Sequence, residues 1–155
     1  MKRAVWCLLL ATACRTVAVG GSPTPTSGTI GADSPRGAVE SFLAAARSQD
    51  MVTLGRLFGD ETGLAKDRDD KDQFEKREII MMCTLKHDKA TVTDGAATVG
   101  GERVFQVELR QGTLQGNSKF TAVRGPGERW FVKGFDIVAL QNKGFCQSAN
   151  ANKKP

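Results

Sequence analysis

The chain has 155 residues, a length that suits one domain, and its 40% hydrophobic and 25% charged residues are typical of a globular protein rather than a disordered one. The formal net charge is +5, of which Lys2 and Arg3 contribute two. The other bases alternate with acids, whereas nucleic-acid-binding proteins concentrate basic charge on one face or tail, so we expect no nucleic-acid partner. A single histidine argues against a multi-histidine metal site, and the sequence contains no metal or cofactor motif.

Residues 1–13 have the layout of a secretory signal peptide. Lys2 and Arg3 give a positive start, and an apolar run follows from Ala4 to Ala11. This run is too short to span a bilayer of about 30 Å as a helix. We therefore expect an exported protein, and a buried apolar N-terminal helix is the structural alternative for this segment.

The end of this segment resembles a bacterial lipobox, because small residues stand directly before Cys14. In such proteins the signal is cut before the cysteine, which then carries diacylglycerol and an acylated amine. The resemblance implies a lipid anchor at Cys14, although Ala11 stands where Leu is usual. Cleavage near Ala18 or Gly20 by an ordinary signal peptidase is the alternative. Residues 14–33 are rich in Gly, Pro, Ser and Thr, which predicts a flexible linker.

Four cysteines are present, and their positions assign them different roles. Cys7 lies in the predicted signal peptide, and Cys14 is the predicted lipidation site. Cys83 and Cys146 remain as an even pair, which in an exported domain predicts a disulfide. Two separate buried thiols are the alternative. Because no C-x-x-C spacing occurs, we expect neither thiol-redox nor zinc chemistry.

Helical patterns occupy the first part of the predicted domain, residues 34–146. Ser34 can cap a helix whose first turn accommodates Pro35. Asp50 can cap a second, short helix that ends near Gly59 to Gly63. In the first of these helices, apolar residues recur at helical spacing: Ala38, Val39, Phe42, Leu43 and Ala46.

A charged segment, residues 64–72, is expected to form an exposed loop before a third helix from Gln73 to Leu85. The run Ile79-Ile80-Met81-Met82 in this helix is apolar all round, which predicts burial on more than one side. The Met pair is expected in the core, with a Met-lined ligand pocket as the alternative.

Strand patterns follow the third helix. The predicted strands are Lys89 to Thr93, Ala97 to Val99, Glu102 to Arg110, Lys119 to Arg124 and Arg129 to Val138. Their turns are expected at Asp94-Gly95, Gly100-Gly101 and residues 125–128, and a polar tail occupies residues 147–155. Helices followed by hairpin-linked strands predict an α+β fold with three N-terminal helices on a curved antiparallel sheet of about four strands.

Three stretches resemble a known superfamily. Residues Ser34 to Ala46, followed by Gln49-Asp50 and a short helix, resemble the opening of the nuclear-transport-factor-two-like superfamily and of small bacterial lipoproteins within it. Lys89 to Thr93 resembles their first strand, and Gly127 to Val132 resembles their closing "G-x-W-x-V" strand. The resemblance covers residues 33–140 and implies a cone-shaped roll with a pocket between sheet and helices. Such cones host enzymes, binding modules and domains without a known ligand, so the fold does not fix the function.

The pocket that this resemblance implies has four candidate residues: Phe42, Met81, Trp130 and Asp136. If Asp136 faces inward from the last strand, burial would raise its pKa and make it a candidate base. The alternation of residues along this strand does not decide which way Asp136 faces, because both faces of the strand are partly apolar. Trp130 is expected to be core or pocket wall. His87 and Asp88 are adjacent on an extended segment, so they point to opposite sides, and His87 is expected to be exposed.

These patterns favour an exported, lipid-anchored protein of the bacterial cell envelope whose domain lies in the periplasm or outside the cell. We expect a non-enzymatic domain that binds a small apolar ligand or a partner protein, and no residue is assigned as catalytic. One alternative is a cyclase- or isomerase-type enzyme that uses a carboxylate such as Asp136. Another is an accessory subunit of an envelope or secretion complex. An apolar interior would argue against the enzyme, and a large exposed apolar patch would favour a partner.

Overall fold

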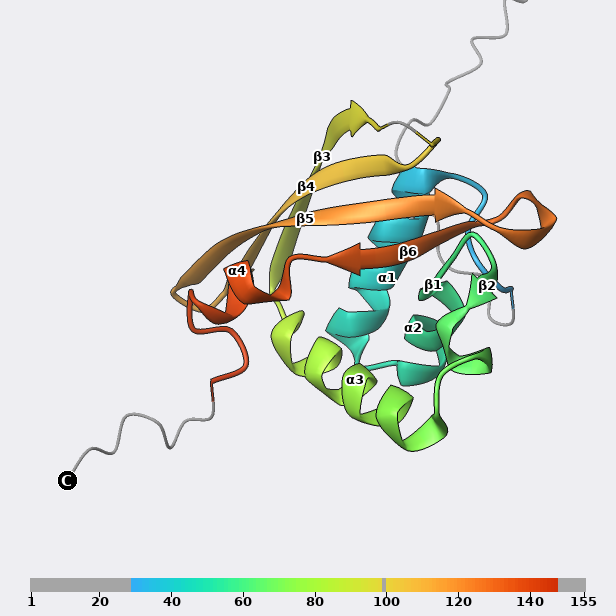
Figure 1. Cartoon of the computed structure of the whole chain (residues 1–155). Coiled ribbons are helices and arrows are strands. Elements are labelled where there is room, and N and C mark those ends of the chain that lie inside the picture. Colours follow the sequence, from blue (N-terminus) through green and yellow to red (C-terminus); the bar gives the residue numbers. More distant parts are fainter. Residues whose placement is uncertain (1–28, 99, 148–155) are drawn as a thin grey trace, which may run out of the picture.

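The computed structural model describes residues 29–98 and 100–147. The predicted signal peptide, Cys14, most of the predicted linker and the tail from residue 148 lie outside the described residues. The described part has the predicted α+β fold, with helices first and an antiparallel sheet of order β3-β4-β5-β6 after them (Figure 1). The main helices are α1 (Pro35–Ser48), α2 (Met51–Leu57) and α3 (Lys71–Thr84), and the strands of the sheet are β3 (Lys89–Ala97), β4 (Arg103–Gln111), β5 (Leu114–Arg124) and β6 (Trp130–Phe135). The smaller elements are β1 (Gly59–Asp60), β2 (Gly63–Leu64), the 3-10 turns η1 (Ala65–Asp67) and η2 (Pro126–Glu128), and α4 (Ile137–Gln141).

Polar side chains cap the three main helices. Ser34 accepts a hydrogen bond from the backbone N–H of Gly37 at 3.0 Å, and Asp50 accepts one from Thr53 at 3.0 Å. Both predicted caps are therefore confirmed, because each side chain satisfies a backbone donor that the helix leaves free. Asp70 does the same for α3, and this helix consequently begins at Lys71, two residues before the predicted start.

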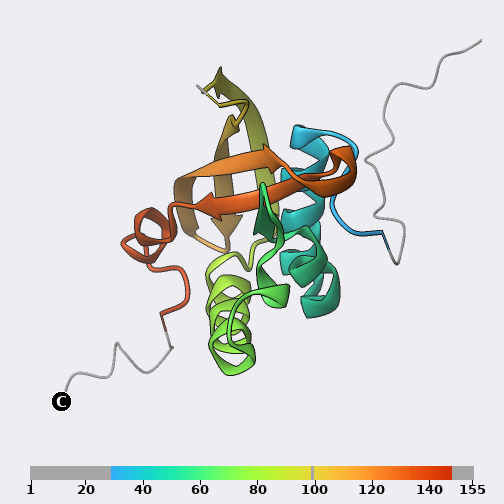
Figure 2. The same ribbon diagram turned by 45° about the vertical axis from the view of Figure 1, so that its right-hand side comes forward.

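The helices pack on one face of the sheet (Figures 1 and 2). Phe42 of α1 lies at the centre, with its ring centroid 6.1 Å from that of Phe58, 6.5 Å from that of Phe120 and 6.3 Å from that of Phe135. The predicted alternation of β4 is confirmed, since Phe105, Val107 and Leu109 all face this core. The opposite face of β4 carries polar side chains.

The predicted hairpin at Asp94-Gly95 is wrong. β3 continues through both residues to Ala97, with an irregular register between Asp94 and Ala97. A Cβ atom on Gly95 would lie 2.3 Å from the Val104 carbonyl oxygen, so the glycine permits a close backbone approach within the sheet. In the described chain the change of direction falls near Gly100 and Gly101, whose φ angles of 97° and 83° favour glycine.

Further boundaries differ from the sequence prediction, and β5 begins at Leu114, five residues before the predicted start at Lys119. β6 ends at Phe135, because the chain turns into α4 at Asp136. The segment after Gly63 is not simply an exposed loop, since Leu64 and Ala65 are buried. The end of the predicted linker belongs to the domain, because Ala32 and Trp130 exchange two backbone hydrogen bonds of 2.8 Å.

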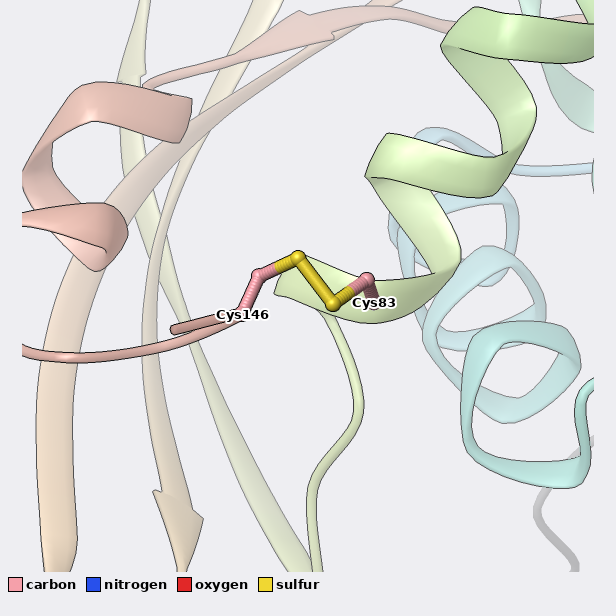
Figure 3. The surroundings of a disulfide bond; sticks show 2 residues. All are labelled: Cys83 and Cys146. Carbon is pink, nitrogen blue, oxygen red and sulfur yellow. A yellow bond between two sulfur atoms is a disulfide. The ribbon is translucent and has the colours of Figure 1, made fainter. Parts of the chain in front are cut away.

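The predicted disulfide between Cys83 and Cys146 is confirmed. It joins the end of α3 to the segment that follows α4, with 5.0 Å between the two Cα atoms (Figure 3). Leu140 and Phe145, on the same C-terminal segment, are fully buried. This segment is thus held covalently as well as by packing. Among the described residues, none of the helices has the length and apolar character needed to cross a membrane.

Candidate functional site

Packed side chains of the main core cluster occupy the centre between sheet and helices, and a pocket of about 290 Å³ opens beside it between α1 and β3. Phe42 and Met81, two of the candidate pocket residues, are buried members of the main core cluster. The aromatic rings around Phe42 occupy the region in which a cone-shaped fold would carry a pocket. These two residues therefore contribute to packing in this structure.

Asp136 does not point into the interior. Its side chain is exposed, and it accepts a hydrogen bond from the backbone N–H of Ala139 at 3.0 Å as the N-cap of α4. Alternation in the sequence leaves the orientation of Asp136 open, and the structure places the residue outside the last strand, which ends at Phe135.

A stability measurement checks this role of Asp136. Asp136→Ala is expected to lower the free energy of unfolding by about 1 kcal/mol, the usual contribution of an N-cap. Asp136→Asn is the matched control, since asparagine also caps, and it is expected to lose less. Chemical denaturation of both variants checks the prediction, and equal losses would contradict a capping role.

Trp130 lies at the edge of the sheet, partly buried. Its ring lies below the guanidinium of Arg124, which is 5.6 Å from the ring centroid. It lines a cleft of about 370 Å³ together with residues such as Glu61 and Arg103. The four candidate residues therefore do not converge on one pocket.

His87 is buried, which corrects the expectation of an exposed histidine. Its Nδ1 donates a hydrogen bond to the carbonyl oxygen of Leu85 at 2.7 Å, and burial lowers the pKa of its imidazole. The carboxylate of Asp88 accepts a hydrogen bond from the backbone N–H of Gly112 at 2.7 Å. Both side chains therefore fix the connection between α3 and β3, and they do not form a catalytic dyad.

A surface groove of about 510 Å³ lies beside the disulfide. Its walls come from the start of α2, the C-terminal half of α3, the β4–β5 turn and the segment after α4. The lining residues are Gln49, Met51, Ile79, Met82, Cys83, Lys86, Gln111, Leu114, Gly144, Cys146 and Gln147. Sequence reasoning missed this site because its residues come from four separate parts of the chain.

Exposed apolar side chains gather at this groove. Ile79, 59% exposed, and Met51, 37% exposed, both line it. The prediction that the Ile79 to Met82 run is buried on more than one side is thus wrong for its two isoleucines, whereas the two methionines are buried. The helical spacing from Phe74 could have indicated this, because Met81 and Met82 face the same side as Phe74, and Ile79 and Ile80 do not.

A second pocket of about 350 Å³ continues along the same valley between α2 and α3. It shares Met51 with the first pocket. The α3 residues that line the two pockets follow one another at helical spacing and form a single stripe: Phe74, Glu75, Glu78, Ile79, Met82, Cys83 and Lys86. We refer to the two pockets together as the α2–α3 groove.

Comparisons of the chain with protein-family models, with curated proteins and with solved structures find no match. The resemblance to the nuclear-transport-factor-two-like superfamily therefore stays a prediction. Within residues 29–98 and 100–147, no three His, Cys, Asp or Glu side chains gather in a way that could hold a metal ion.

Proposed function

We propose that this protein is an exported, lipid-anchored envelope protein whose domain binds the apolar part of an amphiphilic molecule in the α2–α3 groove, without catalysing a reaction. The observation that carries the proposal is the gathering of exposed Met51, Val52 and Ile79 along one valley. Isolated apolar residues on a surface are ordinary, whereas apolar side chains grouped at a concave site favour a ligand. Polar Lys86 and Gln49 at the same groove suit the polar part of such a ligand.

The packed interior supports binding at the surface over chemistry in a central pocket. An enzyme of the cyclase or isomerase type needs a cavity in which a carboxylate meets its substrate. Phe42 packs against aromatic neighbours at the centre of the core, and the carboxylate of Asp136 lies at the surface. The geometry that the enzyme alternative required is therefore not present at Asp136.

The proposed location rests on the sequence, with one structural observation in support. The disulfide between Cys83 and Cys146 suits an oxidising compartment outside the cytoplasm. Intact-mass measurement of the protein from the envelope fraction tests the anchor. We expect a chain that begins at a lipid-modified Cys14, and an unmodified chain that begins after Cys14 would contradict it.

Titration with dodecyl maltoside below its micelle concentration, followed by NMR chemical shifts, tests binding in the groove. We expect the largest shifts at groove residues in the wild-type domain. Ile79→Lys places a charge where the dodecyl chain packs, and it is expected to weaken binding by about tenfold or more, the effect of losing one buried aliphatic contact.

Val138→Lys is the matched control for this experiment. Val138 is also a largely exposed aliphatic residue, but it lies on α4 and does not line the groove. Its replacement is expected to leave dodecyl maltoside binding unchanged. Equal weakening by both variants, or shifts spread over the polar face of the sheet, would contradict a site in the α2–α3 groove.

A further inference from the structure

The second pocket of the α2–α3 groove is lined by the carboxylate of Glu78, for which the described residues supply no hydrogen bond. Glu78 is only 7% exposed, although it is an acidic residue in the middle of α3. No hydrogen bond or ion pair within the described part of the chain involves its carboxylate, and its oxygens are not among the polar atoms that are both cut off from solvent and unpartnered, so they keep some contact with solvent. Leaving a charged group buried and unpaired is costly, so most buried carboxylates are paired.

The carboxylate of Glu78 lies directly against the backbone of α2. A Cβ atom on Gly55 would lie 2.6 Å from Glu78 Oε1, so a larger residue at this position would require the carboxylate to shift. Met51, Val52 and Phe74 give the pocket apolar walls, and the exposed side chains of Lys66, Lys71 and Glu75 complete its lining. The pocket thus combines the buried carboxylate of Glu78 with a hydrocarbon surface in a volume of about 350 Å³.

The charged groups around Glu78 do not neutralise it. Lys71 lines the pocket but pairs with Glu75, at 3.9 Å. Lys66, on the 3-10 turn η1, also lines the pocket, and its charge lowers the pKa of Glu78, whereas burial and Glu75 raise it. Burial is the largest of these effects, so the pKa of Glu78 is raised overall. The α2 residues that line the pocket carry no charge.

We propose that this pocket binds the ammonium group of an alkylamine or of a similar cationic amphiphile, with Glu78 as its counter-ion. The hydrocarbon chain of such a ligand would lie on Met51, Val52 and Phe74 and continue toward Ile79 in the neighbouring pocket. Pairing with an ammonium group supplies the charge that the buried carboxylate lacks. This inference rests on the proposed function and narrows its ligand to a cation, because Glu78 is the buried charged residue of this pocket, whereas Lys66, Lys71 and Glu75 are exposed to solvent.

Titration of the wild-type domain with hexylamine at neutral pH, followed by NMR chemical shifts, tests the proposal. Hexan-1-ol and hexanoate have the same hydrocarbon chain without the positive charge. We expect hexylamine to bind about tenfold or more tightly than either, because a charge-assisted contact contributes on the order of 1.5–3 kcal/mol. Glu78→Gln is expected to remove this preference.

Asp72→Asn is the matched control, because it removes one carboxylate from the same helix outside the pocket. It is expected to leave the preference for hexylamine intact. Equal binding of hexan-1-ol and hexylamine, or an unchanged preference in Glu78→Gln, would overturn the proposal. If the wild type showed no preference for hexylamine and Lys66→Met did, the proposal would also be overturned, because Lys66 would then be the partner of Glu78.

Dodecyl maltoside separates the failure of this inference from the failure of the proposed function. Its uncharged head group does not need Glu78, so Glu78→Gln is expected to bind it as the wild type does. If dodecyl maltoside binds and hexylamine shows no preference, only the cationic ligand is wrong. If neither binds in the groove, the proposed function fails as well.

The stability of Glu78→Gln gives a readout that does not depend on a ligand. A raised pKa means that the folded protein holds the proton of Glu78 more firmly than the unfolded chain does, so this residue lowers stability as the pH rises above its usual pKa of about 4.5. Glu78→Gln is therefore expected to be more stable than the wild type near pH 7 and about equal to it near pH 3. Urea unfolding at both pH values measures the difference. A less stable Glu78→Gln near pH 7 would show an internal partner for the carboxylate and overturn the proposal.

Discussion

Replacing both Cys83 and Cys146 by serine is expected to lower the free energy of unfolding by about 4 kcal/mol. The disulfide connects residues 63 positions apart, and opening so long a loop raises the conformational entropy of the unfolded chain. The variant is still expected to fold at low temperature, because Leu140 and Phe145 keep the C-terminal segment in the core. Equilibrium urea unfolding measures the loss.

Wild-type protein treated with a reductant is the matched control for the double variant. It carries the same open loop without any substitution, so its free energy of unfolding is expected to fall by the same amount. An unchanged unfolding midpoint in both samples would show that the bond contributes little. A loss in the variant alone would assign the effect to the serine side chains.

Phe42→Ala is expected to lower the free energy of unfolding by about 4 kcal/mol, within the usual range for a buried phenylalanine. Phe42 is fully buried, and its ring contacts Phe58, Phe120 and Phe135. The substitution leaves a cavity between helices and sheet that these large rings fill only in part. Chemical denaturation measures the loss.

Ile80→Ala removes an aliphatic side chain of similar chemistry from the solvent-exposed side of α3 and serves as the control for Phe42→Ala. Its effect is expected to stay within about 0.5 kcal/mol, as for most surface substitutions. Comparable losses in the two variants would contradict the assignment of Phe42 to the centre of the core.

Features of the fold that depend on neighbouring residues could be predicted from the sequence. The caps Ser34 and Asp50 act within their own helical turns, and the alternation of β4 follows from one buried face. The disulfide followed from counting cysteines in a domain expected to be exported. These predictions needed no knowledge of what lies across the fold.

Features that depend on contacts across the fold were missed. In the sequence, Gly95 is typical of a turn. In the structure it lies within the sheet and allows the Val104 carbonyl to approach its backbone closely. Asp136 stands inside an apolar run that looks like one strand, although it is also placed to cap the short helix that follows. In both cases local sequence allowed two structures, and packing of the sheet selected the one that periodicity did not favour.

The candidate site was predicted least well. A central pocket was predicted from four residues, Phe42, Met81, Trp130 and Asp136. In the structure Phe42 and Met81 belong to the core, Trp130 lies at the edge of the sheet, and Asp136 caps a helix. Glu78 could have been noticed, because it stands four residues after Phe74 and therefore shares the buried side of α3. Gly55, the glycine opposite Glu78, could not have been recognised, because the sequence of neither helix shows that α2 packs against α3.

The disulfide also has a mechanical consequence for a domain held at its N-terminal end. All four strands of the main sheet, together with α4, lie between Cys83 and Cys146. A force that pulls the two ends of the chain apart can extend the residues outside this interval, but it cannot lengthen the interval itself while the bond is intact. At about 3.4 Å per residue, the closed loop contains roughly 200 Å of chain that cannot be extended while the bond is intact. The sheet is therefore shielded from direct tension, and stretching would unravel the helices α1, α2 and α3 first.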